Sequence, residues 1–206
     1  MVNGHVEISM GDKTRAKKVT LSHCFAMASH EVTVVQFQKF RTDQKPDADY
    51  SPQSNCPMNR VSWYDAVAYY NWLSDQEGIP QDQWCYEPND QREYSSGVKI
   101  AADYLERSGY RLPTDEEWEF VCRANSTGGY GFGEPLELLT RYAWYNINSK
   151  NQMWPVGTNL PNGLGVFDMH GNAREWCHNL YRVPKGQPDL GAKAEDRRSL
   201  NNGGHP

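Results

Sequence analysis

Apolar residues recur at helical spacing in three stretches of the chain, and each stretch follows a residue that caps helices well. In the first stretch, Thr33 precedes Val34, Phe37 and Phe40. A threonine hydroxyl before the first turn accepts a hydrogen bond from a backbone N–H that has no partner inside the helix. The pattern therefore predicts a helix that starts after Thr33.

The second stretch predicts a helix that starts at Ser62. Asp65 stands three positions after Ser62 and resembles the acidic arm of a capping box. The apolar residues that then fall on one face are Trp63, Ala66, Val67, Tyr70 and Leu73. That face is expected to be buried.

The third stretch has the clearest helix start. Pro113 precedes Thr114-Asp-Glu-Glu117, which reads as a full capping box whose acids also suit the positive end of the helix dipole. Trp118, Val121 and Cys122 are expected to form the inward face.

Irregular sequence dominates between these helices. Residues 23–30 predict a strand, whereas residues 41–58 and 76–98 hold many turn-forming residues and predict loops. Glycines and short apolar runs alternate with turns over residues 125–176. We therefore predict a single α+β domain over residues 1–206 with few helices and many loops.

Composition and charge exclude several classes of function. The net charge is −5, and the basic residues are scattered apart from Lys13–Lys18, so a nucleic-acid surface is not expected. No apolar run approaches the about 18 residues that a membrane span needs. The first residues show no signal-peptide core, so the default expectation is a cytoplasmic protein or a piece of a longer one.

The cysteines are widely separated along the chain. They are Cys24, Cys56, Cys85, Cys122 and Cys177. An odd number without a Cys-x-x-Cys pair argues against a zinc site and against a dense disulfide scaffold. We expect most of them to be buried thiols.

Four sequence blocks carry a family resemblance. They are Phe25–Thr33, Pro57–Ala66, Gly109–Phe120 with its Arg-Leu-Pro-Thr-x-x-Glu-Trp-Glu signature, and Pro155–Trp176 with Gly-Asn-x-x-Glu-Trp at its end. In this order they resemble the formylglycine-generating enzyme (sulfatase-modifying factor) family. The resemblance implies that family's fold, a loop-rich α+β arrangement with short antiparallel strands, related to C-type lectin-like domains.

The last block contains a candidate calcium site. Asp168 and Glu175 are hard oxygen donors on either side of a glycine-containing turn, and calcium takes six to eight oxygens in flexible geometry. The resemblance implies calcium ligands at Asp168 and Glu175 by side chain and at Gly171 and Ala173 by backbone carbonyl. The alternative is that Asp168 caps a turn and Glu175 pairs with a nearby arginine.

Two other features receive structural interpretations. Glu87-Pro-Asn89 matches a tripeptide with which C-type lectins bind sugars, but the companion Trp-Asn-Asp triplet is missing, so these residues are expected to serve the loop. His170 lies in the Asp168–Glu175 turn and is expected to bond to backbone.

The resemblance also implies an activity whose residues are missing. The family oxidises a cysteine of a sulfatase peptide to formylglycine with oxygen and copper(I), a soft ion held by two nearby thiolates. In the family, this pair follows an Arg-Gly-Gly-Ser block, which Arg197–Gly204 resembles in part. None of the five cysteines matches the pair. We therefore expect the chain to lack the family's C-terminal segment, to bind no copper in the family's way and to be inactive as it stands.

A second class of function stays open beside the oxidase, which would act on a sulfatase. Non-catalytic relatives of this fold serve as binding or scaffolding domains for a peptide or protein partner, often within larger bacterial proteins. A third reading, a sulfoxide synthase of the ergothioneine type, would need an iron-binding histidine cluster that this sequence does not supply.

Overall fold

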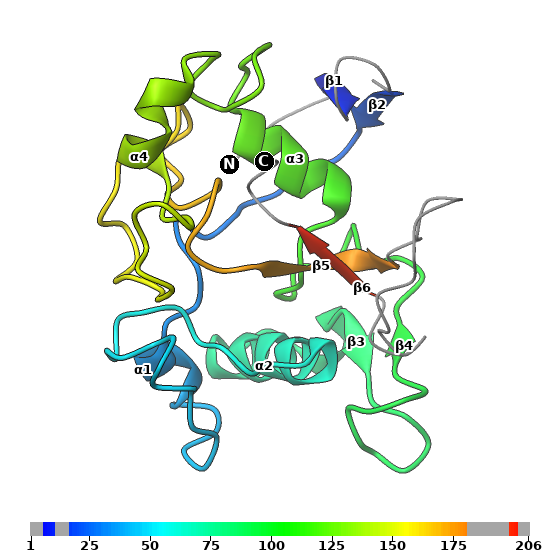
Figure 1. Ribbon diagram of the computed structural model, residues 1–206. Helices are drawn as coiled ribbons and strands as arrows, with labels where there is room; N and C mark the ends of the chain where they lie inside the picture. Colours follow the sequence, from blue (N-terminus) through cyan, green and yellow to red (C-terminus); the bar gives the residue numbers. More distant parts are fainter. Residues whose placement is uncertain (1–5, 11–16, 181–197, 202–206) are drawn as a thin grey trace, which may run out of the picture. The chain divides into compact units, whose positions relative to one another are not determined.

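A computed structural model of the chain describes residues 6–10, 17–180 and 198–201 (Figure 1). Its elements are β1 Val6–Met10, β2 Lys17–Leu21, α1 Val34–Phe37, α2 Trp63–Gln76, η1 Gln81–Gln83, β3 Tyr86–Glu87, β4 Lys99–Ile100, α3 Asp115–Arg123, η2 Leu136–Leu138, α4 Leu139–Tyr142, β5 Glu175–Leu180 and β6 Arg198–Asn201. In the described residues the strands pair as β1 with β2, β3 with β4 and β5 with β6. The loop-rich α+β class predicted from the sequence is confirmed.

Residue contacts divide the chain into two compact units. Of the described residues, the first unit contains 6–10, 17–60, 115–175 and 201, and the second contains 61–114, 176–180 and 198–200. The single domain expected over residues 1–206 stays a prediction.

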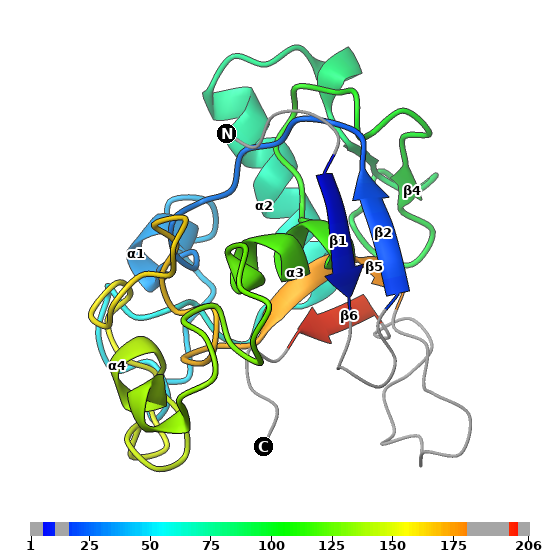
Figure 2. The same cartoon turned by 90° about the horizontal axis from the view of Figure 1, so that it is seen from above.

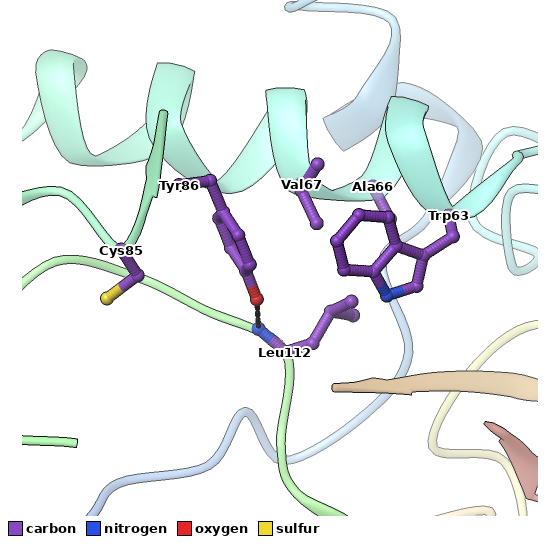
Figure 3. Packing of buried hydrophobic residues seen from close by; sticks show 6 residues of the cluster. All are labelled: Trp63, Ala66, Val67, Cys85, Tyr86 and Leu112. Carbon is purple, nitrogen blue, oxygen red and sulfur yellow. Dashed lines mark hydrogen bonds between the residues drawn. The ribbon is translucent and has the colours of Figure 1, made fainter. Parts of the chain in front are cut away.

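The second unit is built on α2. Ser62 caps this helix as predicted, and both arms of a capping box with Asp65 are present. Figure 3 shows the core below the helix, where the Tyr86 hydroxyl points at Leu112 and accepts its backbone N–H at 3.0 Å. The buried cluster consists of Trp63, Ala66, Val67, Cys85, Tyr86 and Leu112. Each large side chain there contributes about 1.5–3 kcal/mol through burial.

The buried face of α2 differs in part from the predicted one. Tyr70 and Leu73 are only half-buried, while Asn71 and Ser74 are buried. Asn71 donates to the backbone carbonyl of Tyr86 at 2.6 Å, so the helix packs against the polar backbone of β3 as well as against side chains. Apolar periodicity cannot detect such a contact, because the buried residues are polar.

The loop predicted over residues 76–98 is wrong in its middle. It contains η1 and the two-residue strand β3, and Cys85 and Tyr86 are completely buried. A strand this short shows no alternation that sequence periodicity can register.

The first unit contains α1 and α3. Thr33 caps α1 as predicted, and Gln36 completes a capping box, but the helix ends at Phe37 and Phe40 lies beyond it. The α3 helix buries Trp118, Val121 and Cys122 as predicted.

The strand expected at residues 23–30 is wrong, since this segment forms no strand. The nearest strand is β2, which ends at Leu21, before this segment begins. Two-stranded pairing of β1 with β2 gives a hairpin that lies beside α3 (Figure 2). His23 follows the hairpin and contacts the buried Glu117 carboxylate of α3 at 2.6 Å.

Replacing Tyr86 by phenylalanine tests the core of the second unit. The change removes the acceptor of the buried Leu112 N–H and the hydroxyl that lies 3.3 Å from Nδ1 of His178. We expect urea unfolding to show a loss of about 2 kcal/mol. Tyr50→Phe is the control, since Tyr50 is 53% exposed and its loss should stay within about 0.5 kcal/mol. Equal losses would contradict the assigned hydrogen bonds.

Candidate metal centre

The turn from Asp168 to β5 is held in an uncommon backbone conformation. Asp168 and Asn172 have φ of 60° and 66°, in the left-handed region that few non-glycine residues adopt. The Asn172 amide accepts the N–H of Trp154 at 2.8 Å and donates to its carbonyl at 3.1 Å. The Asn172 backbone N–H also donates to the carbonyl of Trp144 at 2.8 Å. These contacts fix the turn against the segment that contains both tryptophans.

The two predicted carboxylate ligands each have one oxygen bonded to the protein. Oδ2 of Asp168 accepts the N–H of Gly157 at 2.8 Å, whereas Oδ1 is buried and has no partner. Oε2 of Glu175 accepts the indole N–H of Trp118. These partners differ from those of the alternative interpretation, since Gly157 lies 11 residues before Asp168 and the group that donates to Glu175 is an indole.

A third carboxylate, that of Glu31, lies near these two and was not among the predicted ligands. Glu31 precedes α1, and neither of its carboxylate oxygens makes a hydrogen bond of ordinary geometry. The negative charges of Glu175 and Asp168 lie close enough to raise its pKa. Glu31 lies in the Phe25–Thr33 block, whose resemblance implies the fold but no ligand.

Burial raises the pKa of all three carboxyl groups. The pKa of Glu31 lies well above its ordinary value, first because of burial and then because of its two acidic neighbours. Burial also raises the pKa of Asp168 and of Glu175, against the opposing effects of the Gly157 and Trp118 hydrogen bonds. Three buried acids this close cannot all ionise at low cost unless a positive charge compensates them.

The donor set suits a hard cation. All candidate atoms are oxygens, the chemistry that calcium prefers, and Oδ1 of the 5% exposed Asp168 faces no protein partner. Across the described residues, no three His, Cys, Asp or Glu side chains already stand in an arrangement that holds a metal ion. A cation here would therefore draw the carboxylates closer and use backbone carbonyls as well.

The other candidates have structural roles. His170 accepts the N–H of Gly131 through Nε2 at 2.9 Å, which confirms the expected bond to backbone. The Asn89 side chain accepts two backbone N–H groups of its own loop and donates to Ser95 and Ser96. The Asn89 side chain therefore serves its loop as expected, whereas Glu87 belongs to strand β3.

The cysteines are free thiols, and all except the exposed Cys24 are buried, as expected. Burial raises the pKa of Cys56 and Cys85, and that of Cys122 to about 12. These thiols therefore stay protonated near neutral pH, whereas only the deprotonated thiolate binds soft metals.

The sequence matches the family model of the sulfatase-modifying factor enzyme 1-like domain over residues 2–205. The chain belongs to this family. A relative described as chaperone protein LppX, from Paenibacillus barcinonensis, is 31% identical to this chain. The alignment extends over 206 residues with its gaps and covers 82% of this chain and 70% of the relative.

Proteins described as formylglycine-generating enzymes, active or inactive, are also similar to this chain. The enzyme of Mycobacterium tuberculosis is 28% identical over 141 residues, 63% of this chain and 36% of the enzyme. The mouse protein described as inactive C-alpha-formylglycine-generating enzyme 2 is 33% identical over 158 residues, 72% of this chain and 40% of that protein. The part that matches this chain is thus well under half the length of each of these two proteins.

Solved structures confirm the fold. Treponema denticola variable protein 1 superposes with a TM-score of 0.69 at 21% identity, covering 95% of this chain and 85% of that one. PvdO from Pseudomonas aeruginosa gives a TM-score of 0.61 at 21% identity, covering 87% and 69%. Within the described residues, no helix is long and apolar enough to cross a membrane.

Proposed function

We propose that this chain is a partner-binding domain of the sulfatase-modifying factor family and that, as it stands, it does not oxidise sulfatase cysteines. The state of its cysteines carries this proposal. Buried thiols with raised pKa values do not offer a copper(I) ion the thiolate pair it needs, and Cys24 stands alone at the surface.

The similarity to relatives supports a binding role over an enzymatic one. The relative that shares most of its length with this chain is described as a chaperone, and a mouse relative is described as inactive. By analogy, the partner is another polypeptide. The oxidase remains the competing function, because the family includes formylglycine-generating enzymes.

An oxidation assay separates the two functions. The chain is incubated with copper(I), oxygen and a cysteine-containing sulfatase peptide, and formylglycine is measured by mass spectrometry. Turnover above that of copper alone, lost in Cys24→Ser, would contradict the proposal. The binding role predicts no turnover, together with reduced light scattering from heat-denatured citrate synthase, for which an equal amount of lysozyme is the control.

A calcium ion in the Asp168–Glu175 turn is the second part of the proposal. The carboxylates of Glu31, Asp168 and Glu175 would hold it, with the backbone carbonyls of Gly171 and Ala173. The ion would supply the positive charge that three buried acids lack, and it would hold the segment before α1 to the turn before β5.

Calcium should stabilise the chain against unfolding. At a calcium concentration about 100 times the Kd, the expected gain is about 2.7 kcal/mol, measured by thermal unfolding in calcium and in chelator. Asp168→Asn removes the charge and should weaken calcium binding at least about tenfold. The exposed Asp49→Asn is the control and should behave as wild type. If the wild-type melting temperature is the same in calcium and in chelator, the calcium site is wrong.

A further inference from the structure

We infer that Trp118 is a positioning residue for the cation, which holds one oxygen of Glu175 and leaves the other to the ion. The inference rests on the calcium site proposed above. It assigns a role to an α3 side chain that would otherwise count only as core.

The hydrogen bond between Trp118 and Glu175 fixes both side chains. Trp118 is 8% exposed, and a buried indole N–H needs an acceptor, because it can only donate. Its acceptor is Oε2 of Glu175, 57 residues further along the chain. A hydrogen bond to a charged acceptor is about twice as strong as a neutral one, so the indole fixes the carboxylate while the rest of α3 fixes the indole.

Asp168 is held in the same manner. The Gly157 N–H occupies Oδ2 and leaves Oδ1 buried without a partner. Asp168 thus keeps one buried oxygen without a partner, and neither oxygen of Glu31 makes a hydrogen bond of ordinary geometry. With the second oxygen of Glu175 and two backbone carbonyls from the turn, a bound ion would find about six oxygen donors, the lower end of the range for calcium.

Loss of the indole donor should weaken the site from a distance. Without it, the ion itself must order the Glu175 side chain and bear the full cost of the buried charge. Groups that orient metal ligands typically contribute 10–100-fold to metal affinity.

Calcium titration of the full chain by calorimetry tests this role. Trp118→Phe keeps an aromatic ring but removes the donor, and it should raise the calcium Kd about 10–100-fold. Trp63→Phe is the matched control. It also removes a buried indole hydrogen bond, here to the carbonyl of Cys177 at 3.2 Å, but no carboxylate is involved. It should lower stability and leave the Kd unchanged.

The outcomes separate the inference from the proposal on which it rests. If wild type binds calcium and Trp118→Phe binds it within about twofold, the positioning role is overturned and the site stands. If wild type binds no calcium, the site itself is wrong and the role falls with it.

A second measurement needs no variant that could fail to fold. In ¹⁵N-labelled wild type, calcium should shift the indole N–H resonance of Trp118 and leave that of Trp63 in place. A Trp118 resonance that stays constant from chelator to saturating calcium would overturn the inference.

Discussion

Replacing Gly171 by alanine should destabilise the chain by about 3–4 kcal/mol. A Cβ at this position would lie 2.2 Å from the carbonyl oxygen of Trp144 and 3.0 Å from its carbonyl carbon. Both are backbone atoms, so no flexible side chain can move aside. The Trp144 carbonyl is also fixed by the Asn172 N–H, so relief of the clash breaks a hydrogen bond of the turn.

Urea unfolding in chelator measures this effect without any contribution from calcium. Gly163→Ala is the matched control, because a Cβ there meets the carbonyl oxygen of Ala124 at an ordinary 3.5 Å and its φ is not left-handed. That variant should stay within about 0.5 kcal/mol of wild type. Similar losses in the two variants would mean that the turn is not packed as described.

Local sequence signals predicted the helix starts well. Thr33 and Ser62 cap their helices with side-chain hydrogen bonds to residues three positions later, a contact that the sequence contains completely. The family blocks then supplied the fold class, which propensity alone does not give. Both kinds of signal lie in contiguous residues.

Features that depend on distant residues escaped prediction. The two-residue strand β3 became core because Tyr86 reaches Leu112 and Asn71 reaches its carbonyl. The prediction of a strand over residues 23–30 is wrong because an extended sequence does not reveal whether a partner strand exists.

In the candidate site too, residues that are close in sequence could be predicted and distant ones could not. Asp168 and Glu175 were predictable, since one turn contains both, with the calcium itself still a proposal. Glu31 and Trp118 were not, because each meets the turn only after the chain has folded back on it. Glu31 lies in one of the family blocks, but its acidic neighbours come from a distant part of the chain.

Glu31→Gln should change stability in opposite directions with and without calcium. In chelator, burial and the nearby acids raise the pKa of Glu31 above the ordinary 4.5. Such a group stabilises the fold at pH values below 4.5 and loses that contribution as pH rises through its raised pKa. At pH 7.5 the neutral variant should therefore be more stable than wild type by about 1–2 kcal/mol, and the difference should vanish near pH 4.

In saturating calcium the order should reverse. An amide offers one oxygen and no charge where the carboxylate offers two oxygens and a charge, so the Kd should rise on the order of 100-fold, or about 2.7 kcal/mol. Urea unfolding in both buffers measures the reversal, and Glu106→Gln, an exposed acid, should leave stability unchanged in each. A variant less stable than wild type in both buffers would show that Glu31 is held by contacts other than a cation. The reversal of sign is what distinguishes a ligand from a structural acid, because only a ligand makes the wild-type charge favourable when the ion is present.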